Sequence, residues 1–440
     1  MKRKITIIGT GHVGLVTGAC FAEMGHKVVC VDRDKEKIKN LKKGIIPIYE
    51  PHLKELVSKN IKKKRLNFTS SIKEGIKESK IIFICVGTPA RIDGNADLSS
   101  IEAVTREIAQ LSTSDKIIVE KSTVPVKTEE YVKKTLDLYK KNKKIKFFVV
   151  SNPEFLREGS SIKDFLEPDR IVIGVEDEKA KEIMLDIYSS IKAPKIVTDL
   201  KSAELIKHVS NTFLALKISF INLIAQICEK TGADIKEVAL GMGLDKRIGK
   251  SFLEAGIGYG GSCLPKDIKA FIRILKDLGI EAALLESIED INKKQREFFF
   301  QKIKDSLWNV SGKTIGILGL AFKPNTDDIR EAPSITIINK LLKEGAKIKA
   351  YDPVAIDRAK KVFGKKIKFA KNLYEVARNA DALVILTEWD EFKNMDLRKI
   401  KKLLKLPKII DGRNIFDPKK MAQLGFNYSC LGRKQYNENI

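Results

Sequence analysis

The chain has 440 residues, of which 43% are hydrophobic, and a formal net charge of +25. This length predicts two or three domains, and no apolar run in the sequence is long enough to indicate a membrane span. The charge is mostly lysine spread along the whole chain without interleaved aromatic residues. We therefore expect solvated lysine faces that attract an anionic substrate, and no nucleic-acid or membrane partner. The six cysteines have no paired spacing, which argues against a zinc site or a disulfide framework and indicates reduced thiols in the cytoplasm.

The first segment has the pattern of a dinucleotide-binding unit. The apolar run KITIIG leads into GTGHVG, where Gly9, Gly11 and Gly14 have G-x-G-x-x-G spacing; a helical pattern and the run KVVCVD follow. Such glycines permit a tight turn and let a pyrophosphate approach a helix N-terminus. Asp32, at the end of KVVCVD, can accept hydrogen bonds from ribose hydroxyls and favours NAD over NADP, although Arg33 beside it leaves NADP open.

Three more apolar runs predict parallel strands: IIFICVGTP, KIIVEKSTVP and KFFVVSNPEF. Each run ends in polar or turn residues, and ligands bind at the carboxyl ends of parallel strands. We therefore expect Thr88, Thr123 and Glu154 to lie on one rim of a nucleotide crevice, although each could also be an ordinary cap or turn residue.

From about Lys201 the chain has few helix breakers and strong helical periodicity. A helix that is apolar on nearly all sides should be buried, as a connector between domains or as a dimer contact. Lys207 and Asn211 are four residues apart and share one face. Inward-facing Lys and Asn are costly without polar partners, although Lys207 alone could reach solvent. We expect His208 to be structural.

A glycine-rich segment, GIGYGGSCLPKD, places Cys263 just before Lys266 and Asp267. Glycines let the backbone approach a ligand closely, and a thiol near a lysine is a candidate reactive thiolate. A flexible turn with a small buried cysteine is the alternative.

The strand and glycine-turn pattern returns near residue 312. KTIGILGLAFKPNTDDIREAP places Gly316 and Gly319 at the predicted turn, and ITIINKLLKEGAKIKAYDP places Asp352 at the end of the next strand. DALVILTEW and PKIIDGRN add two further strands. This half could bind the phosphates and base of a nucleotide as well as a dinucleotide.

The predicted fold class is α/β, with two doubly wound Rossmann-like domains joined by a long central helix and a helical middle domain. We predict an N-terminal NAD-binding domain over 1–198, a central helical domain over 199–298 and a C-terminal domain over 299–440. Clefts between domains favour ligand binding, so the cysteine loop is a candidate site.

Six segments occur in one order: GTGHVGLVTG, PIYEPHLKELV, STVPV, NPEFLREGSSIKDFLEPDRIVIG, GIGYGGSCLPKD and GLAFKPNTDDIREAPS. Together they closely resemble the UDP-glucose/GDP-mannose dehydrogenase family, over nearly the whole chain to DGRN near Gly412. The resemblance implies oxidation of the primary alcohol of a sugar nucleotide to the acid, with two NAD⁺. It implies UDP-glucose as substrate, with GDP-mannose or a UDP-N-acetylhexosamine as alternatives.

The resemblance also implies how the residues act. Cys263 would add to the aldehyde formed first, so that a second hydride leaves and a thioester remains for hydrolysis. Lys207 and Asn211 would stabilise the oxyanion at the reacting carbon. Carboxylates and a water would complete the reaction, with Thr123 and Asp267 holding the water, Glu158 as base or water relay, and Glu154 as base or substrate-positioning group.

Two further sets follow from the resemblance. The implied cofactor residues are Gly9, Gly11, Val13, Gly14, Asp32, Lys37, Thr88, Thr123, Glu158, Lys266 and Arg330. The implied substrate residues are Phe155, Leu156, Arg157, Lys207, Asn211, Arg247, Phe252, Leu253, Glu254, Ala255, Gly256, Tyr259, Gly260 and Lys323, with Arg247 reaching the site of a dimer partner.

Two positions depart from the family pattern. Lys127 replaces a glycine, so we expect the loop backbone there to avoid positive φ. Ala90 replaces a common threonine.

Two other functions remain open. A two-electron dehydrogenase would share the first domain but would not need a cysteine in the cleft. A nucleotide-binding regulator that contacts nucleic acid through its charge would show no turnover with NAD⁺.

Overall fold

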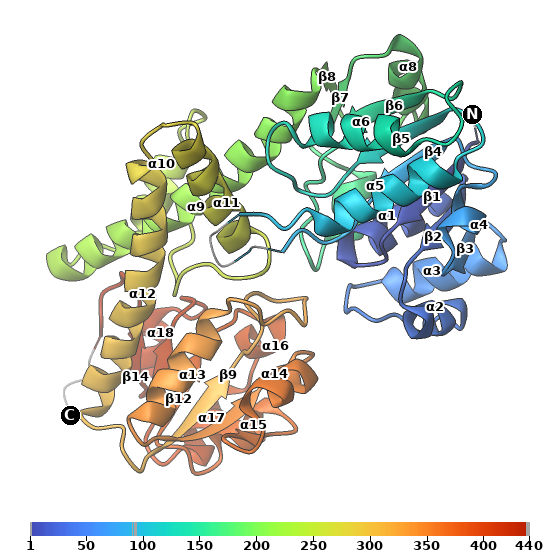
Figure 1. The fold of residues 1–440 in the computed structure, drawn as a ribbon. Helices are drawn as coiled ribbons and strands as arrows, with labels where there is room; N and C mark the ends of the chain where they lie inside the picture. Colours follow the sequence, from blue (N-terminus) through green and yellow to red (C-terminus); the bar gives the residue numbers. More distant parts are fainter. Residues whose placement is uncertain (1, 90, 92–94, 437–440) are drawn as a thin grey trace. The chain divides into compact units, whose positions relative to one another are not determined.

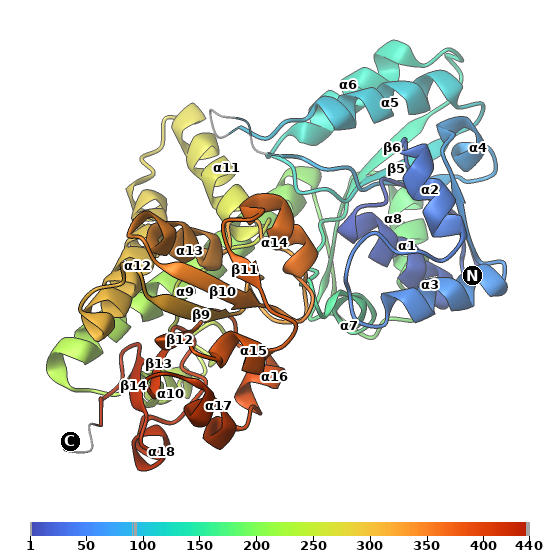
Figure 2. The same cartoon turned by 90° about the horizontal axis from the view of Figure 1, so that it is seen from below.

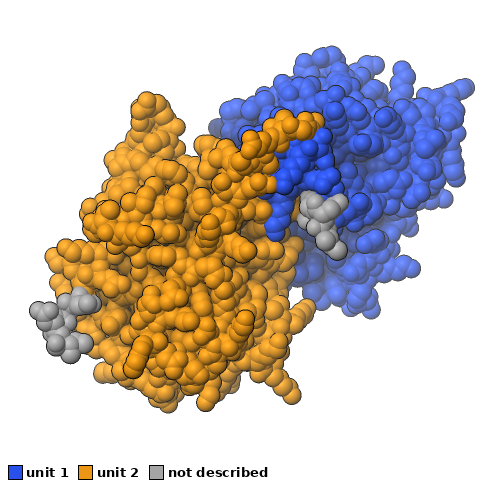
Figure 3. Space-filling view, turned by 60° about the vertical axis from the view of Figure 1, so that its left-hand side comes forward, with its two compact units in different colours: residues 1–210, 269–277 blue, residues 211–268, 278–440 orange. Residues whose placement is uncertain are grey.

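The computed structural model describes residues 2–89, 91 and 95–436, so Ala90 lies outside the described residues. The chain divides into two compact units (Figure 3). The first comprises Met1–Ser210 with Lys269–Asp277, and the second comprises Asn211–Ile268 with Leu278–Ile440. Helices α9 (Leu200–Thr231) and α11 (Leu264–Asp277) each contribute residues to both units.

The first unit contains an eight-stranded sheet of order β3-β2-β1-β4-β5-β6-β7-β8, parallel except between β6 and β7. Its strands are largely apolar and buried, as expected for a parallel sheet covered on both faces. They are β1 (Lys4–Ile8), β2 (Lys27–Val31), β3 (Leu66–Thr69), β4 (Ile81–Ile84), β5 (Lys116–Glu120), β6 (Phe147–Ser151), β7 (Ile171–Val175) and β8 (Lys195–Thr198).

Two hydrophobic cores cover the faces of this sheet. One face packs against α1, α3, α7 and α8, and the other packs against α4, α5 and α6 (Figure 2). The helices of this unit are α1 (His12–Glu23), α2 (Lys35–Lys42), α3 (Leu53–Lys62), α4 (Ile72–Ile76), α5 (Ser99–Leu111), α6 (Thr128–Tyr139), α7 (Ser161–Leu166) and α8 (Glu178–Ile187).

The second unit contains a six-stranded parallel sheet of order β11-β10-β9-β12-β13-β14. Helices α12 to α14 cover one face, and α15 to α18 cover the other. Its strands are β9 (Thr314–Leu318), β10 (Lys347–Tyr351), β11 (Lys368–Phe369), β12 (Ala382–Ile385), β13 (Lys408–Asp411) and β14 (Asn427–Cys430).

In the second unit, α9 is followed by α10 (Ile235–Gly243), by the first part of α11 and by the long helix α12 (Ala283–Leu307). The helices that alternate with the strands of its sheet are α13 (Pro333–Lys343), α14 (Ile356–Phe363), α15 (Leu373–Ala377), α16 (Asp390–Lys393), α17 (Leu397–Leu403) and α18 (Pro418–Gln423). The predicted fold class, two doubly wound α/β sheets with a helical middle, is confirmed.

Helix α9, the long green helix of Figure 1, differs from the sequence expectation in two ways. By length and composition alone it could cross a membrane, as the core helix of a soluble protein also could, and 44% of its most apolar window is buried. In the chain by itself α9 is not covered on all sides, because one apolar row including Phe213, Phe220 and Ile227 is exposed, and burial of this row in a dimer contact stays a prediction. Lys207 and Asn211 are buried, as predicted from their shared face.

Gly316 was predicted at the second glycine turn but lies inside β9, so that prediction is wrong. A Cβ there would meet the Val376 side chain at 2.8 Å, so the glycine serves strand–helix packing. Gly319 does form the turn, with φ +97° and the side chain of Thr387 where its Cβ would be.

The expectation that Lys127 avoids positive φ is also wrong. Its φ is 77°, and it forms the N-cap of α6. Its amide donates to Oε2 of Glu204 at 2.7 Å, a tertiary hydrogen bond that holds the left-handed conformation. A lysine in this conformation carries a steric cost of about 1–2 kcal/mol that a glycine would not.

Lys127→Gly should therefore raise the thermal midpoint of unfolding or leave it unchanged, because relief of strain offsets about 0.5–1 kcal/mol of added chain entropy. The matched change Lys134→Gly, at an exposed position inside α6, should lower stability by about 1 kcal/mol. Calorimetry of both variants makes the comparison, and a loss for Lys127→Gly as large as that for Lys134→Gly would contradict it.

Candidate active site

The glycine turn between β1 and α1 is built for an anion. Gly9 has φ +99°, and its Cβ would lie 2.5 Å from the Cys85 carbonyl oxygen; a Cβ on Gly14 would overlap the Gly9 carbonyl. A Cβ on Gly11 would meet nothing within 4 Å, and no side chain caps this helix N-terminus. Open space at a helix start with free amide donors fits the pyrophosphate of a dinucleotide.

Asp32 follows β2 and accepts hydrogen bonds at its carboxylate from the Thr10 hydroxyl (2.6 Å) and from Lys37 Nζ (2.9 Å). Burial alone would raise the pKa of Asp32, but these hydrogen bonds lower it to about 2. The carboxylate is therefore ionised at neutral pH and can accept from ribose hydroxyls. A cavity of about 260 Å³ beside it is lined by Asp34, Glu36, Lys37, Asn40, Ile45 and Pro47.

The carboxyl ends of β4, β5 and β6 bring their polar residues to one edge of the sheet. The Thr88 hydroxyl donates to the Thr123 carbonyl oxygen at 2.8 Å. The buried carboxylate of Glu154 lies 3.1 Å from Lys207 Nζ through Oε1 and accepts the Leu156 amide at 2.6 Å through Oε2. Both charged side chains of this pair are 5% exposed, so the ion pair is largely removed from water.

Two cations lie near the ring of Phe155. The Arg170 guanidinium is 3.7 Å from its ring centroid, and Lys207 Nζ is 5.3 Å from it. Arg157, the next basic residue, instead forms an exposed pair with Asp164.

Glu50, which the sequence reasoning did not assign, shapes the loop that carries Glu158. Its buried carboxylate accepts the Gly159 amide at 2.7 Å and the Ser161 amide at 2.9 Å. His12 Nε2 lies 3.2 Å from the same carboxylate, which links the glycine turn to this loop. The only sequence signal was its place in the PIYEP segment.

In the second unit, Cys263 directly precedes α11 and is exposed, whereas the other five cysteines are buried. Asp267, one turn into α11, is 1% exposed. It accepts from Lys266 Nζ at 2.6 Å and from Asn211 Nδ2 at 2.5 Å. The cysteine thus lies at a helix N-terminus, where the dipole favours an anion, next to a fixed chain of polar groups.

The glycines of the cysteine loop are required by the C-terminal domain. A Cβ on Gly260 would approach the Glu331 carbonyl oxygen, and one on Gly261 would lie 2.7 Å from the Phe322 ring. Gly261 also has φ +84° and donates its amide to the Arg330 carbonyl oxygen at 2.9 Å. The alternative of a flexible turn with a buried cysteine does not describe this loop.

Tyr259 is 6% exposed, and its hydroxyl has no hydrogen-bond partner within the described part of the chain. Its backbone is held on both sides by α12: the Asn292 side chain accepts its amide, and Arg296 donates to its carbonyl oxygen, both at 2.8 Å. A buried hydroxyl without a partner is costly, so it fits contact with a ligand.

The remaining predicted substrate residues fall into two groups. In segment 252–256, Leu253 and Ala255 are buried in the core against α9, whereas Glu254 is exposed. Phe252 has φ 64°, and both backbone groups of Gly256 are used within the unit, since its amide donates to Asn222 and its carbonyl oxygen accepts from Gln295, both at 2.8 Å.

The second group consists of two cations, Lys323 and Arg247. Lys323 Nζ lies 5.5 Å from the Phe322 ring centroid. Arg330, which was predicted to contact the cofactor, pairs with Asp328 at 2.7 Å. The Arg247 side chain is 89% exposed and pairs with Asp245.

Arg413, in the DGRN segment, was also missed. Its Nε donates to the Leu386 carbonyl oxygen at 2.9 Å and its Nη2 to the Phe322 carbonyl oxygen at 3.2 Å. A Cβ on Gly256 would lie 3.1 Å from Nη1. The signal in the sequence was an arginine directly after a strand end.

Asp352 corresponds in place to Asp32 but is used differently. It is 0% exposed and accepts the amides of Leu320 (2.8 Å), Ala321 (3.1 Å) and Ala355 (2.9 Å). The acid closes its own turn and does not face a ribose, so this sheet is not built as a second site of the Asp32 kind.

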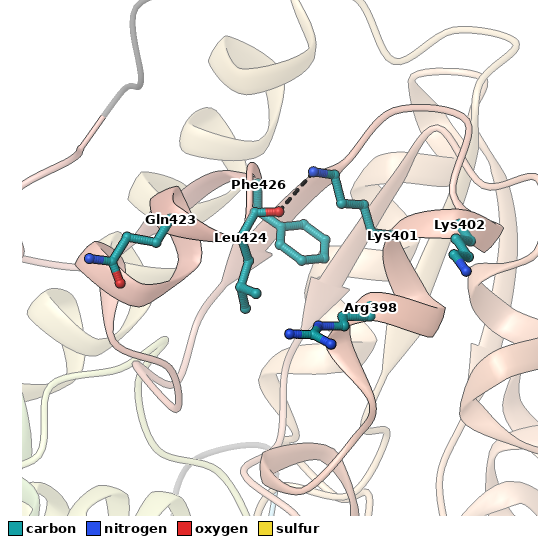
Figure 4. A pocket seen from close by; sticks show the side chains of 6 residues that line it. All are labelled: Arg398, Lys401, Lys402, Gln423, Leu424 and Phe426. Carbon is teal, nitrogen blue, oxygen red and sulfur yellow. Dashed lines mark hydrogen bonds between the residues drawn. The ribbon is translucent and has the colours of Figure 1, made fainter.

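A cavity of about 330 Å³ in the C-terminal domain is lined by Arg398, Lys401, Lys402, Gln423, Leu424 and Phe426 (Figure 4). Lys401 crosses it to donate to the Leu424 carbonyl oxygen at 2.8 Å. Residues 423–426 precede β14, so the cavity lies at the amino end of the sheet, opposite the end where ligands of such folds bind.

Three family models match the chain in succession. They are the NAD binding domain (residues 3–192), the central domain (201–294) and the UDP binding domain (316–418) of the UDP-glucose/GDP-mannose dehydrogenase family.

Similar proteins match over nearly their whole length. The UDP-glucose 6-dehydrogenase TuaD of Bacillus subtilis is 49% identical over 431 residues, 98% of this chain and 93% of that protein. A UDP-glucose 6-dehydrogenase of Rhizobium meliloti is 46% identical, and the match covers 98% of this chain and 99% of that protein. Among solved structures, a UDP-glucose dehydrogenase from Pyrobaculum islandicum has a TM-score of 0.91 and 37% identity, covering 98% and 97%. A UDP-D-ManNAc dehydrogenase from Pyrococcus horikoshii has a TM-score of 0.86 and 28% identity, and the match covers 98% of this chain and 99% of that chain.

The matched domains, the full-length relatives and the glycine turn with its ionised Asp32 agree. The chain belongs to the UDP-glucose/GDP-mannose dehydrogenase family, and it is an NAD-dependent oxidoreductase.

Proposed function

We propose that this chain oxidises UDP-glucose to UDP-glucuronate in two hydride transfers, each to one NAD⁺. The observation that carries the proposal is Cys263, the exposed cysteine at the start of α11, one turn from the buried chain Asn211–Asp267–Lys266. Relatives named as UDP-glucose 6-dehydrogenases, 42–49% identical over nearly the whole chain, favour UDP-glucose over other sugar nucleotides.

Bound NAD⁺ supplies the acceptor for each hydride. The open N-terminus of α1 at Gly11 would hold its pyrophosphate, and Asp32 with Lys37 would hold the ribose nearest the 260 Å³ cavity. Val13, Thr88, Lys266 and Arg330 remain candidates for further contacts with it.

In the first oxidation, the hydroxyl proton of the sugar goes to a base and the hydride leaves its carbon, which gives an aldehyde. Glu154 is the carboxylate held against Lys207, so it is a suitable base, and Lys207 is a donor for the oxygen as its charge develops. In a site shielded from water such a donor contributes about 3–4 kcal/mol to the transition state.

In the second oxidation, the thiolate of Cys263 adds to the aldehyde carbon, and Lys207 and Asn211 stabilise the oxyanion. Departure of the hydride from that carbon leaves a thioester on Cys263. Water then attacks the thioester, releasing the carboxylic acid and restoring the thiol. Thr123 and Asp267 would hold this water, and Glu158 would take its proton.

With limiting UDP-glucose and excess NAD⁺, we expect two NADH per sugar nucleotide, measured by absorbance, and UDP-glucuronate by mass spectrometry. Cys263→Ser should lower kcat by about 10³-fold or more, because a hydroxyl is a far weaker nucleophile than a thiolate. The control Cys228→Ala, at a buried position, should retain both oxidations.

One NADH per sugar would contradict the double oxidation. Turnover only with GDP-mannose or a UDP-N-acetylhexosamine would leave the chemistry standing and replace the substrate.

Asp32→Asn should weaken NAD⁺ binding by about 10- to 100-fold, since a hydrogen bond to a charged acceptor is worth about 1.5–3 kcal/mol. Titration of NAD⁺ by calorimetry measures the loss. Glu55→Gln removes one negative charge from the exposed face of α3 and should change the affinity less than twofold by long-range electrostatics. Equal losses in the two variants would mean that Asp32 acts only through net charge.

The exposed apolar row on α9 supports a homodimer. Leu205, Val209, Phe213, Phe220, Leu223 and Ile227 are 40–59% exposed, and α10 and its end add Leu240, Leu244 and Ile248. Their three- and four-residue spacing places the α9 residues on one helix face, which suits a second copy of the same helix. Arg247, exposed near the same α10 segment, could then reach the partner's site.

We expect the wild type to sediment as a dimer and the double change Phe213→Glu with Phe220→Glu to sediment as a monomer. Leu138→Glu, at an exposed apolar position on α6, should leave the mass unchanged. A monomeric wild type, or a double variant that remains dimeric, would exclude this interface.

The six thiols and the nucleotide substrate favour the cytoplasm as the location of this protein.

A further inference from the structure

One turn of α9 holds both ends of the loop that carries Thr123. His208 Nε2 lies 2.7 Å from the Val124 carbonyl oxygen, directly after Thr123. Because a carbonyl oxygen only accepts, Nε2 carries the hydrogen. Three residues further along the loop, Lys127 donates its amide to Glu204 at 2.7 Å, and Glu129 donates its amide to the same carboxyl group at 3.2 Å.

Both α9 side chains are buried in places that tolerate little movement. His208 is 1% exposed and stacks on Phe271 with ring centroids 6.0 Å apart, and Glu204 is 3% exposed. Burial, and then the nearby Glu129 carboxyl, raises the pKa of Glu204 to about 10. Both carboxyl oxygens of Glu204 accept a backbone amide, Oε2 from Lys127 and Oε1 from Glu129, so a glutamine at that position can keep only one of these two hydrogen bonds.

Lys207 lies on this same helical turn and is paired with Glu154. The turn from Glu204 to His208 thus contacts two loops. Lys207 contacts the loop after β6 through Glu154, and Glu204 and His208 contact the loop after β5. The left-handed φ of Lys127 belongs to this arrangement, since the hydrogen bond to Glu204 holds it.

We propose that Glu204 and His208 are positioning residues that fix Thr123 in register with Lys207. They touch neither cofactor nor substrate in this role and act through the backbone of loop 122–128. The proposal rests on the proposed function, in which Thr123 helps to hold the water that hydrolyses the thioester. Loosening the loop should slow this step more than it weakens the binding of either substrate.

The test compares disruptive and conservative variants at each position. His208→Leu cannot donate to Val124, whereas His208→Gln can; Glu204→Ala cannot accept from Lys127, whereas Glu204→Gln can. We expect kcat to fall about tenfold or more in the Leu and Ala variants, with KM for NAD⁺ and UDP-glucose within about threefold of wild type. His208→Gln should recover to within about threefold of the wild-type kcat, and Glu204→Gln, which keeps one of the two amide hydrogen bonds, should have a kcat between those of wild type and Glu204→Ala.

A matched control is His26→Leu in the same unit. His26 is buried, and its Nε2 lies 3.4 Å from the Ile187 carbonyl oxygen, so the change also removes a buried imidazole next to a carbonyl. It should lower the thermal midpoint but leave kcat unchanged. This separates positioning from general loss of stability.

Hydrogen exchange of the ligand-free protein provides a readout independent of activity. Peptides covering residues 122–130 should exchange faster in His208→Leu and Glu204→Ala than in wild type, at the wild-type rate in His208→Gln, and at an intermediate rate in Glu204→Gln. A kcat within twofold of wild type in both disruptive variants, or Gln variants as impaired as Leu and Ala, would overturn the proposal. If wild type itself does not oxidise UDP-glucose, the proposed function fails, and the exchange pattern alone decides whether the two residues hold the loop.

Discussion

Two polar side chains one turn apart on a mostly apolar helix, Lys207 and Asn211, are buried and must be satisfied. An unpaired ammonium in such a place would cost several kcal/mol, so Lys207 requires a carboxylate, and Glu154 supplies it. Asn211 is satisfied by Asp267. A buried ion pair contributes little net stability, since desolvation consumes most of the attraction. Its effect here is to fix where Glu154 lies within the first unit, and within the second unit Asn211 fixes the start of α11 through Asp267.

The cysteine loop depends on a second constraint, which is steric. Gly260 and Gly261 have no room for a Cβ because the backbone at Glu331 and the ring of Phe322 occupy that space. Asn292 and Arg296 hold the intervening Tyr259 backbone from α12. The loop is therefore held on two sides within its own unit, and Cys263 follows directly from a segment with little freedom. A nucleophile gains from such fixation, because a reacting atom held in place does not lose that freedom in the transition state.

The two Rossmann-like sheets show how one pattern can serve two purposes. Each has a glycine turn followed by a strand after which an aspartate comes directly, and the first glycine of each turn, Gly9 or Gly319, has positive φ. Asp32 is held by a hydroxyl and an ammonium, which leave its carboxylate ionised, and the ammonium belongs to Lys37, which lines a cavity. The carboxylate of Asp352 instead accepts the backbone amides of Leu320 and Ala355, which belong to the turns on either side of it. The same residue type in the same place is thus a ligand-binding group in one sheet and a turn-closing group in the other.

Local pattern was enough to predict much of this molecule. Apolar runs of strand length, the glycine spacing and the place of Asp32 predicted the central strands of both sheets, but not β3, β7, β8, β11 and β14 towards their edges, because strand burial and turn sterics depend on residues close in the sequence. The shared face of Lys207 and Asn211 followed from helical periodicity alone. Tertiary contacts decided the rest. Lys127 adopts a left-handed φ because Glu204, 77 residues away, accepts its amide. Gly316 serves packing against Val376, and α9 has one exposed face because the rest of the chain covers only the other. The sequence did not show what Glu50, His208 and Arg413 contact, since their roles arise from hydrogen bonds to distant backbone atoms that no pattern of neighbours encodes.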